Sequence, residues 1–183
     1  LLGGRGLMSD DTEHAAITAR SFALSGGDPE RFERELARGL KRWLWALPPT
    51  TGMATARALL QLSFGVAPAR AGVMSAGNGA CMRAPILGSL VDDPELLWEL
   101  THRSSRMTHK DPRAIEGAFL VARWTQMSRL LGQRASIKQL KDHTHPRHVR
   151  PDSPLWLSSS VVFTTLHGSV SVKVEPMQIG RAH

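Results

Sequence analysis

The chain has 183 residues, 42% of them hydrophobic and 21% charged, a composition typical of one globular domain with a substantial core. A single cysteine, Cys81, excludes an internal disulfide and any multi-cysteine metal site, and it favours an intracellular, cytoplasmic protein. No apolar run is long enough to span a bilayer, so no membrane partner is expected.

The formal net charge of +7 is spread unevenly along the chain. Residues 1–133 hold 16 Lys and Arg against 13 Asp and Glu, whereas residues 134–183 hold 7 against 3. Such basicity attracts phosphates and nucleic acid. No basic run or aromatic platform accompanies it, so specific nucleic-acid recognition is not expected.

Apolar side chains at helical spacing dominate the sequence up to about residue 131. Helices are predicted over residues 11–24, 29–47, 51–62, 84–91, 94–107 and 112–131. Three of them begin with an Asp-Pro pair, in which the aspartate caps the helix and the proline takes its first position, at residues 28–29, 93–94 and 111–112.

The character of the sequence changes after about residue 133. Residues 141–148 are polar and contain three histidines, which indicates either a metal cluster or, as we prefer, a flexible solvated loop. Residues 161–165 and 170–174 have the composition of two strands, which predicts a β-hairpin that turns at residues 166–169.

The stretch Ser9, Asp10 and Asp11 offers three side-chain oxygens at the start of the first predicted helix. Oxygen ligands of this kind suit a hard divalent cation such as magnesium, which binds one or two carboxylates and keeps several waters. The alternative is an ordinary helix start, because a serine N-cap followed by acidic residues also favours the helix dipole.

A second candidate site is the glycine-containing segment of residues 72–83, which leads into an apolar helix. Glycines before a helix let backbone N–H groups approach an anion closely, although a glycine-permitted turn explains the same pattern. His109 stands beside the predicted helix cap at Asp111, where a structural role is the alternative to a functional one.

Three segments in this order resemble the ADP-ribosylglycohydrolase family, which includes the dinitrogenase-reductase-activating glycohydrolases. They are Gly-Leu-Met-Ser-Asp-Asp-Thr at residues 6–12, Gly-Asn-Gly-Ala-Cys-Met-Arg at 77–83 and Ser-Arg-Met-Thr-His-Lys-Asp-Pro at 105–112. The resemblance covers residues 3–133. It implies an all-α, orthogonal helical bundle with a binuclear magnesium site in a central cleft.

The resemblance also implies roles for individual residues. Ser9, Asp10 and Asp11 match the first group of magnesium ligands, and Asp10 or Asp11 is a candidate general base. The loop that binds ADP-ribose is matched by Gly77, Asn78, Gly79 and Met82. His109 matches the histidine beside the ribose. The expected function is magnesium-dependent removal of ADP-ribose from a modified protein or small molecule.

Two family features are missing from the sequence: a first acidic helix before Ser9 and a late Asp-x-Asp-Thr motif that completes the metal site. We therefore expect a fragment with impaired activity. The alternative is a catalytically inactive ADP-ribose-binding module. Residues 1–133 are expected to form a partial family domain. Residues 134–183 are expected to form an atypical, non-native or disordered tail, because residues 179–183 resemble a translated sequencing adapter.

Overall fold

The computed structural model describes residues 9–48, 51–156, 162–165 and 168–171. The chain divides into two compact units, Leu1–Arg150 and Pro151–His183.

The first unit is built from helices, as the all-α prediction requires. Its first half contains α1 (Asp10–Ser25), α2 (Pro29–Trp45), α3 (Met53–Ser63) and α4 (Pro68–Ala71). Its second half contains the short 3-10 helix η1 (Asn78–Arg83), followed by α5 (Ala84–Leu90), α6 (Pro94–Arg106), α7 (Pro112–Leu131) and α8 (Ile137–Asp142). Within the described residues, no helix combines the length and apolar character needed to cross a membrane.

The three predicted Asp-Pro helix starts are confirmed. Asp28, Asp93 and Asp111 each accept a backbone N–H from the first turn of the helix that follows, and a proline opens each helix. The six predicted helices match α1, α2, α3, α5, α6 and α7 to within about two residues at each end.

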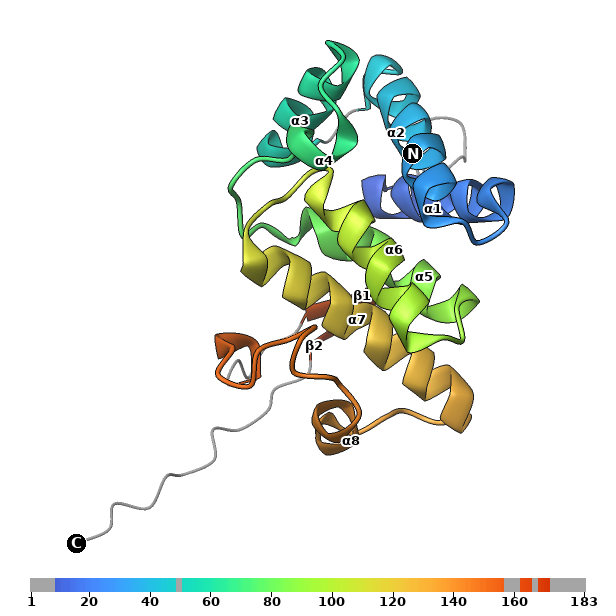
Figure 1. Cartoon of the computed structure of the whole chain (residues 1–183), viewed down its shortest axis with the longest axis vertical. Helices are drawn as coiled ribbons and strands as arrows, with labels where there is room; N and C mark the ends of the chain where they lie inside the picture. The colour runs from blue at the N-terminus through green and yellow to red at the C-terminus, as the bar shows by residue number, and fades with distance from the viewer. Residues whose placement is uncertain (1–8, 49–50, 157–161, 166–167, 172–183) are drawn as a thin grey trace, which may run out of the picture. The chain divides into compact units, whose positions relative to one another are not determined.

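Helix α7 lies at the centre of the core, because α5, α6 and η1 all pack against it (Figure 1). Its buried face includes Ala118, Phe119 and Ala122. Gly88 of α5 allows a close approach, since a Cβ at this position would lie 2.1 Å from the carbonyl oxygen of Ala122. These contacts hold α5 and η1 in a fixed position beside α7.

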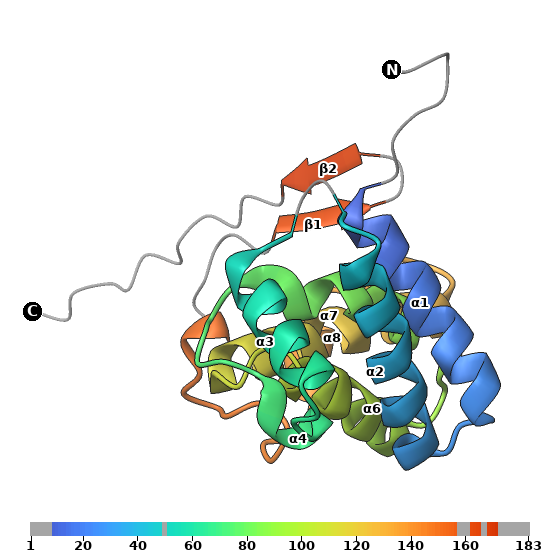
Figure 2. The same cartoon turned by 90° about the horizontal axis from the view of Figure 1, so that it is seen from above.

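Helix α2 connects the first helices to this core. It packs against α1, α3 and α6 (Figure 2). Glu33 of α2 accepts hydrogen bonds from Arg103 and Arg106 of α6, with the closest nitrogen–oxygen pair of each arginine 2.9 Å apart. These ion pairs fix the first turns of α2 against the last turns of α6.

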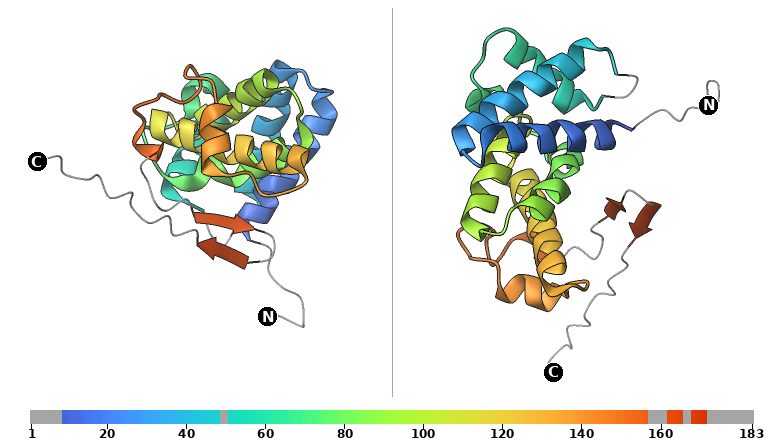
Figure 3. Two further views of the ribbon diagram at one scale, coloured as in Figure 1. Left: turned by 90° about the horizontal axis from the view of Figure 1, so that it is seen from below. Right: turned by 90° about the vertical axis from the view of Figure 1, so that its right-hand side faces the viewer.

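Helix α8 falls in the part of the chain for which an irregular tail was expected, and it lies against α7 (Figure 3). A capping box explains it: Ser136 and Gln139 bond each other's backbone N–H groups. His148 was placed in a solvated loop by its polar neighbours, but it is buried and stacks on Trp98. Local polarity could not reveal that aromatic partner, which lies 50 residues earlier in the sequence.

The second unit contains a 3-10 turn, η2 (Pro154–Trp156), and two strands, β1 (Val162–Thr165) and β2 (Gly168–Ser171). The strands pair antiparallel, with Phe163 opposite Val170. A hairpin was predicted here, but its second strand begins two residues earlier than predicted, because Gly168 and Ser169 belong to β2. The predicted strand residues 161 and 172–174 and the predicted turn residues 166–167 lie outside the described residues.

Candidate active site

A cleft of about 270 Å³ collects most of the residues that the sequence singles out. Six of the eight candidates line it, and they come from three separate segments: Asp10, Gly77, Asn78, Gly79, Met82 and His109. The other two candidates, Ser9 and Asp11, stand at the start of α1 beside Asp10 and are not part of the lining. The rest of the lining comes from Trp43 of α2, from residues 52–55 at the start of α3, and from Ser75.

The glycine segment lies directly against the ring of His109. A Cβ added to Gly79 would lie 2.7 Å from His109 Cε1 and 3.0 Å from Thr55 Oγ1. A Cβ at Gly77 would lie 3.5 Å from His109 Nε2. Side chains at these two positions would therefore fill the space beside the imidazole, so the sequence uses glycine where the loop passes the histidine.

Backbone hydrogen bonds fix His109 in this position. Val73 forms a short parallel bridge with His109: Val73 N–H donates to the carbonyl of Thr108 (3.1 Å), and Lys110 N–H donates to the carbonyl of Val73 (2.9 Å). The His109 N–H donates to the Ser105 carbonyl at the end of α6 (2.8 Å). His109 is thus held both by α6 and by the segment that leads to the glycines.

Beneath the cleft, Arg83 at the end of η1 is completely buried. It donates to the Ser104 hydroxyl (2.8 Å), the Ser104 carbonyl (3.0 Å), the Thr108 hydroxyl (2.7 Å) and His14 Nδ1 (3.2 Å). No carboxylate of the described residues pairs with it, and burial lowers the pKa of Arg83 to about 10. The guanidinium remains charged at neutral pH and connects η1, α1 and α6.

Burial and the nearby Arg83 charge keep two histidines neutral at pH 7. Burial is the larger cause in both, and it lowers the pKa of His109 to about 4 and that of His14 to about 3. His14 meets Trp43 edge to face, with ring centroids 4.3 Å apart. The indole N–H of Trp43 donates to Glu13 (2.5 Å), so α1 fixes the ring that forms one wall of the cleft.

The structure bears on both interpretations of the start of α1, the helix cap and the metal site. Ser9 is its N-cap and accepts the Thr12 N–H, which is the structural alternative. Asp10 lines the cleft, and burial together with the Asp10 charge raises the pKa of Asp11. Among the described residues, no group of three or more histidine, cysteine or acidic side chains is arranged to hold a metal ion. The oxygen donors that the sequence indicates are present as two neighbouring carboxylates, of which Asp10 lines the cleft and Asp11 does not.

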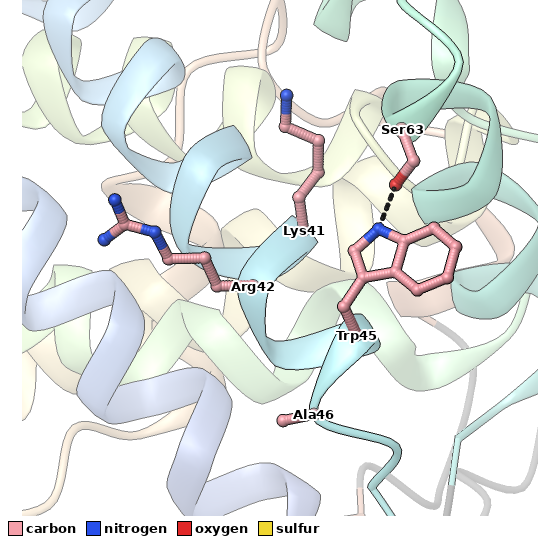
Figure 4. A pocket seen from close by; sticks show the side chains of 5 residues that line it. All are labelled: Lys41, Arg42, Trp45, Ala46 and Ser63. Carbon is pink, nitrogen blue, oxygen red and sulfur yellow. Dashed lines mark hydrogen bonds between the residues drawn. The ribbon is translucent and has the colours of Figure 1, made fainter.

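A second, larger hollow of about 580 Å³ lies between the ends of α2 and α3 (Figure 4). Lys41, Arg42, Trp45, Ala46 and Ser63 line it. Trp45 is 62% exposed, and its indole N–H donates to Ser63 Oγ (3.1 Å). None of the candidate residues from the sequence contributes to this hollow.

Three cleft features were not found by sequence reasoning. Trp43 lies within the helix predicted over residues 29–47, but apolar spacing alone does not show that its side chain lines a cleft. Thr108 and Arg83 were quoted within motifs without a role of their own. A buried arginine without a carboxylate runs against the usual rule for charged residues, so composition gave no signal for it.

Comparison with known proteins agrees with this geometry. The sequence profile of the ADP-ribosylglycohydrolase family matches residues 2–166, and the chain belongs to this family. The match continues past residue 133, where the motif resemblance was expected to end. An uncharacterized protein of Archaeoglobus fulgidus is 36% identical over 120 residues, which make up 64% of this chain and 38% of that protein. The chain thus matches well under half of that relative's length.

Proposed function

We propose that the chain binds ADP-ribosyl groups in the cleft at His109 and contributes to hydrolysis of the bond that joins ADP-ribose to an acceptor. The observation that carries this proposal is the meeting of three distant segments in one cleft. Asp10, the glycines at residues 77 and 79, and His109 share a single lining of about 270 Å³. Family membership supports the reaction class.

The chemistry of the lining suits a sugar phosphate. Gly77 and Gly79 have no Cβ, so the backbone of the loop lies close to the His109 ring and forms part of the cleft lining, where a ligand oxygen can approach it. The neutral ring of His109 adds a hydrogen-bonding group, and Trp43 adds an apolar wall. The cleft is slightly smaller than common ligand pockets of about 300–1,000 Å³. We therefore assign it one ribose and its adjoining phosphate.

We further propose that Asp10 and Asp11 hold a divalent cation, with magnesium as the first candidate. Two carboxylates with retained waters are a sufficient set for a partly hydrated magnesium ion. The raised pKa of Asp11 fits such a role, since the repulsion from Asp10 that contributes to it would be offset by a bound cation. When bound, the ion would polarise ribose oxygens and the leaving group.

Asp10 and Asp11 also remain the candidates for the general base. A carboxylate in the cleft lining or next to it can take a proton from an attacking water, and its efficiency as a base rises as its pKa approaches the operating pH. The upward shift at Asp11 favours that residue, while the place of Asp10 in the lining favours contact with the ligand. We also propose that the substrate is an ADP-ribosylated protein or small molecule and that the protein is cytoplasmic. The acceptor to which ADP-ribose is linked is left to the assay described next.

The test is calorimetric titration of ADP-ribose into the chain, with and without magnesium, followed by assay of ADP-ribose release from modified arginine, serine and nucleotide substrates. We expect magnesium-dependent binding that falls about tenfold or more in Asp10→Asn, which corresponds to about 1.4 kcal/mol. Asp28→Asn is the matched control, because it changes an N-cap aspartate outside the cleft.

Each outcome separates the candidates. Binding that depends on magnesium and on Asp10 supports the proposal, and release of ADP-ribose adds the enzymatic step. Binding that ignores both would instead favour an inactive ADP-ribose-binding module. Absence of binding under all conditions would overturn the proposal for this chain.

A further inference from the structure

The hydroxyl of Thr108 lies between the buried guanidinium of Arg83 and the ring of His109. Arg83 Nη2 is 2.7 Å from Thr108 Oγ1, and Thr108 Oγ1 is 2.9 Å from His109 Nδ1. Thr108 is fully buried, and His109 is 2% exposed. These three groups form a short chain of hydrogen bonds that ends at a ring lining the cleft.

The direction of the first bond is fixed by chemistry. A guanidinium has only donors, so Thr108 Oγ1 must accept from Arg83. The hydroxyl hydrogen of Thr108 is then free to be donated to one further acceptor. Two acceptors lie in range: the carbonyl of Ser105 at 3.4 Å and His109 Nδ1 at 2.9 Å.

The Ser105 carbonyl is the poorer of these two acceptors. It already accepts the backbone N–H groups of Thr108 (3.0 Å) and His109 (2.8 Å). A separation of 3.4 Å is also long for a hydroxyl donor, whose usual range is about 2.5–3.0 Å. The hydroxyl hydrogen therefore goes to His109 Nδ1, and the proton of the neutral ring is on Nε2.

We propose that Arg83 and Thr108 are positioning residues that hold His109 as its Nε2-protonated tautomer, so that His109 donates a hydrogen bond to an oxygen of the ligand in the cleft. Among the described residues, Nε2 has no hydrogen-bond partner. It faces Gly77 and Gly79, where a Cβ would lie 3.5 Å and 3.2 Å away.

This assignment narrows the ligand atom that His109 contacts. An Nε2–H group bonds a phosphate oxygen or a hydroxyl oxygen, whereas the opposite tautomer would accept and would repel a phosphate oxygen. The inference rests on the proposed function only for the identity of the ligand. The tautomer itself is a property of the free protein.

The test uses the full chain labelled with ¹⁵N-histidine and measures the ring nitrogens of His109 by NMR at pH 7.5. We expect a protonated Nε2 and an Nδ1 that accepts a hydrogen bond. Thr108→Val removes the hydroxyl at nearly constant volume, so the Nδ1 resonance should shift and ADP-ribose affinity should fall about tenfold or more. Thr108→Ser restores the hydroxyl and should restore both.

Thr101→Val is the matched control. Thr101 is a buried threonine of α6 whose hydroxyl oxygen has no hydrogen-bond partner among the described residues, so its replacement should leave the His109 resonances and the affinity unchanged. A wild-type ring protonated on Nδ1 would overturn the inference, and so would an Nδ1 resonance that ignores Thr108→Val. If the wild type does not bind ADP-ribose, the proposed function fails while the NMR result still decides the tautomer.

Discussion

The cleft at His109 and the hollow at Trp45 differ in what holds their walls. The hollow is about twice as large, but it is lined by five residues from the ends of two helices, and its tryptophan is 62% exposed. The cleft draws on α1, α2, α3, η1 and the segment after α6, and a buried network supports it. Binding sites need groups whose orientation is fixed before the ligand binds. Support from buried residues is therefore a better guide to a binding site than the volume of the cavity.

The two regions also differ in the burial and the partners of their charged side chains. Lys41 and Arg42 form no ion pair with any described residue and remain in contact with solvent. Arg83 is completely buried, and all its described hydrogen-bond partners are neutral groups. Burying a guanidinium costs free energy unless its donors are all satisfied. Among the described residues, Arg83 is the one buried arginine, and its guanidinium donates to His14 and Thr108 beneath the cleft.

Of the changes that test the difference between the two regions, Gly79→Ala is expected to have the largest effect on ligand affinity and stability. The added methyl would lie 2.7 Å from His109 Cε1 and 3.0 Å from Thr55 Oγ1, and the His109 ring is held in place by its hydrogen bond to Thr108. We expect ADP-ribose affinity to fall at least about tenfold, with a loss of about 1–3 kcal/mol in the free energy of unfolding. Calorimetric titration and urea denaturation measure the two quantities.

Gly52→Ala is the control for that variant. Gly52 lines the same cleft, but a Cβ there would have no atom within 4 Å. Its effect should stay below about 1 kcal/mol, since only the weak N-cap preference of glycine over alanine is lost. Equal losses of affinity in both variants would contradict the close contact between Gly79 and His109 as the cause.

The next prediction concerns pH, which affects stability without a predicted tenfold loss of affinity, and it separates the two regions because the residues that line the Trp45 hollow include no histidine. Burial lowers the pKa of His109 to about 4 and that of His14 to about 3 in the folded chain. The unfolded chain takes up these protons near pH 6.5. The stabilisation by the neutral rings is complete above pH 6.5 and is lost progressively as the pH falls towards 4 and 3.

Urea unfolding at pH 7.0 and pH 5.5 measures this loss. Each neutral histidine makes the free energy of unfolding fall by up to about 1.4 kcal/mol per pH unit in this window, so the two together account for about 2–3 kcal/mol. His109→Asn removes one of the two groups and should reduce the difference accordingly. An unchanged pH dependence in His109→Asn would show that His109 is not buried in the neutral form.

Sequence patterns predicted the local parts of this molecule well. Proline after aspartate marks a helix start by backbone geometry alone, so residues 28, 93 and 111 could be recognised as caps. The all-α fold followed from the same local patterns. Residues 9–11, 77–82 and 109 were selected through motifs, and only the packing of α7 against η1 and α6 shows that most of them share a cleft.

The parts that could not be predicted depend on contacts between distant residues. Arg83 reaches His14, 69 residues earlier, and Thr108, 25 residues later. His148 is buried by Trp98, although its neighbours in sequence are polar. Such partners are invisible to periodicity and local composition, which describe one element at a time.

The smallest effect is expected from Trp45→Phe, and a matched variant two residues away makes it informative. Trp43 and Trp45 both belong to α2, and each indole N–H has one partner: Glu13 at 2.5 Å and Ser63 at 3.1 Å. Trp43 is buried in the cleft wall, so Trp43→Phe leaves Glu13 without its donor and should cost about 1–3 kcal/mol and weaken ADP-ribose binding.

Trp45→Phe removes an exposed hydrogen bond that water replaces, so the free energy of unfolding should change by less than about 0.5 kcal/mol. ADP-ribose affinity should stay within about twofold of the wild type, because Trp45 lies outside the cleft lining. Urea denaturation and calorimetry of the two variants under identical conditions give the comparison. If Trp45→Phe weakened binding as much as Trp43→Phe, the ligand would have to extend from the cleft along the end of α2. The cleft at His109 and the hollow at Trp45 would then form one binding surface.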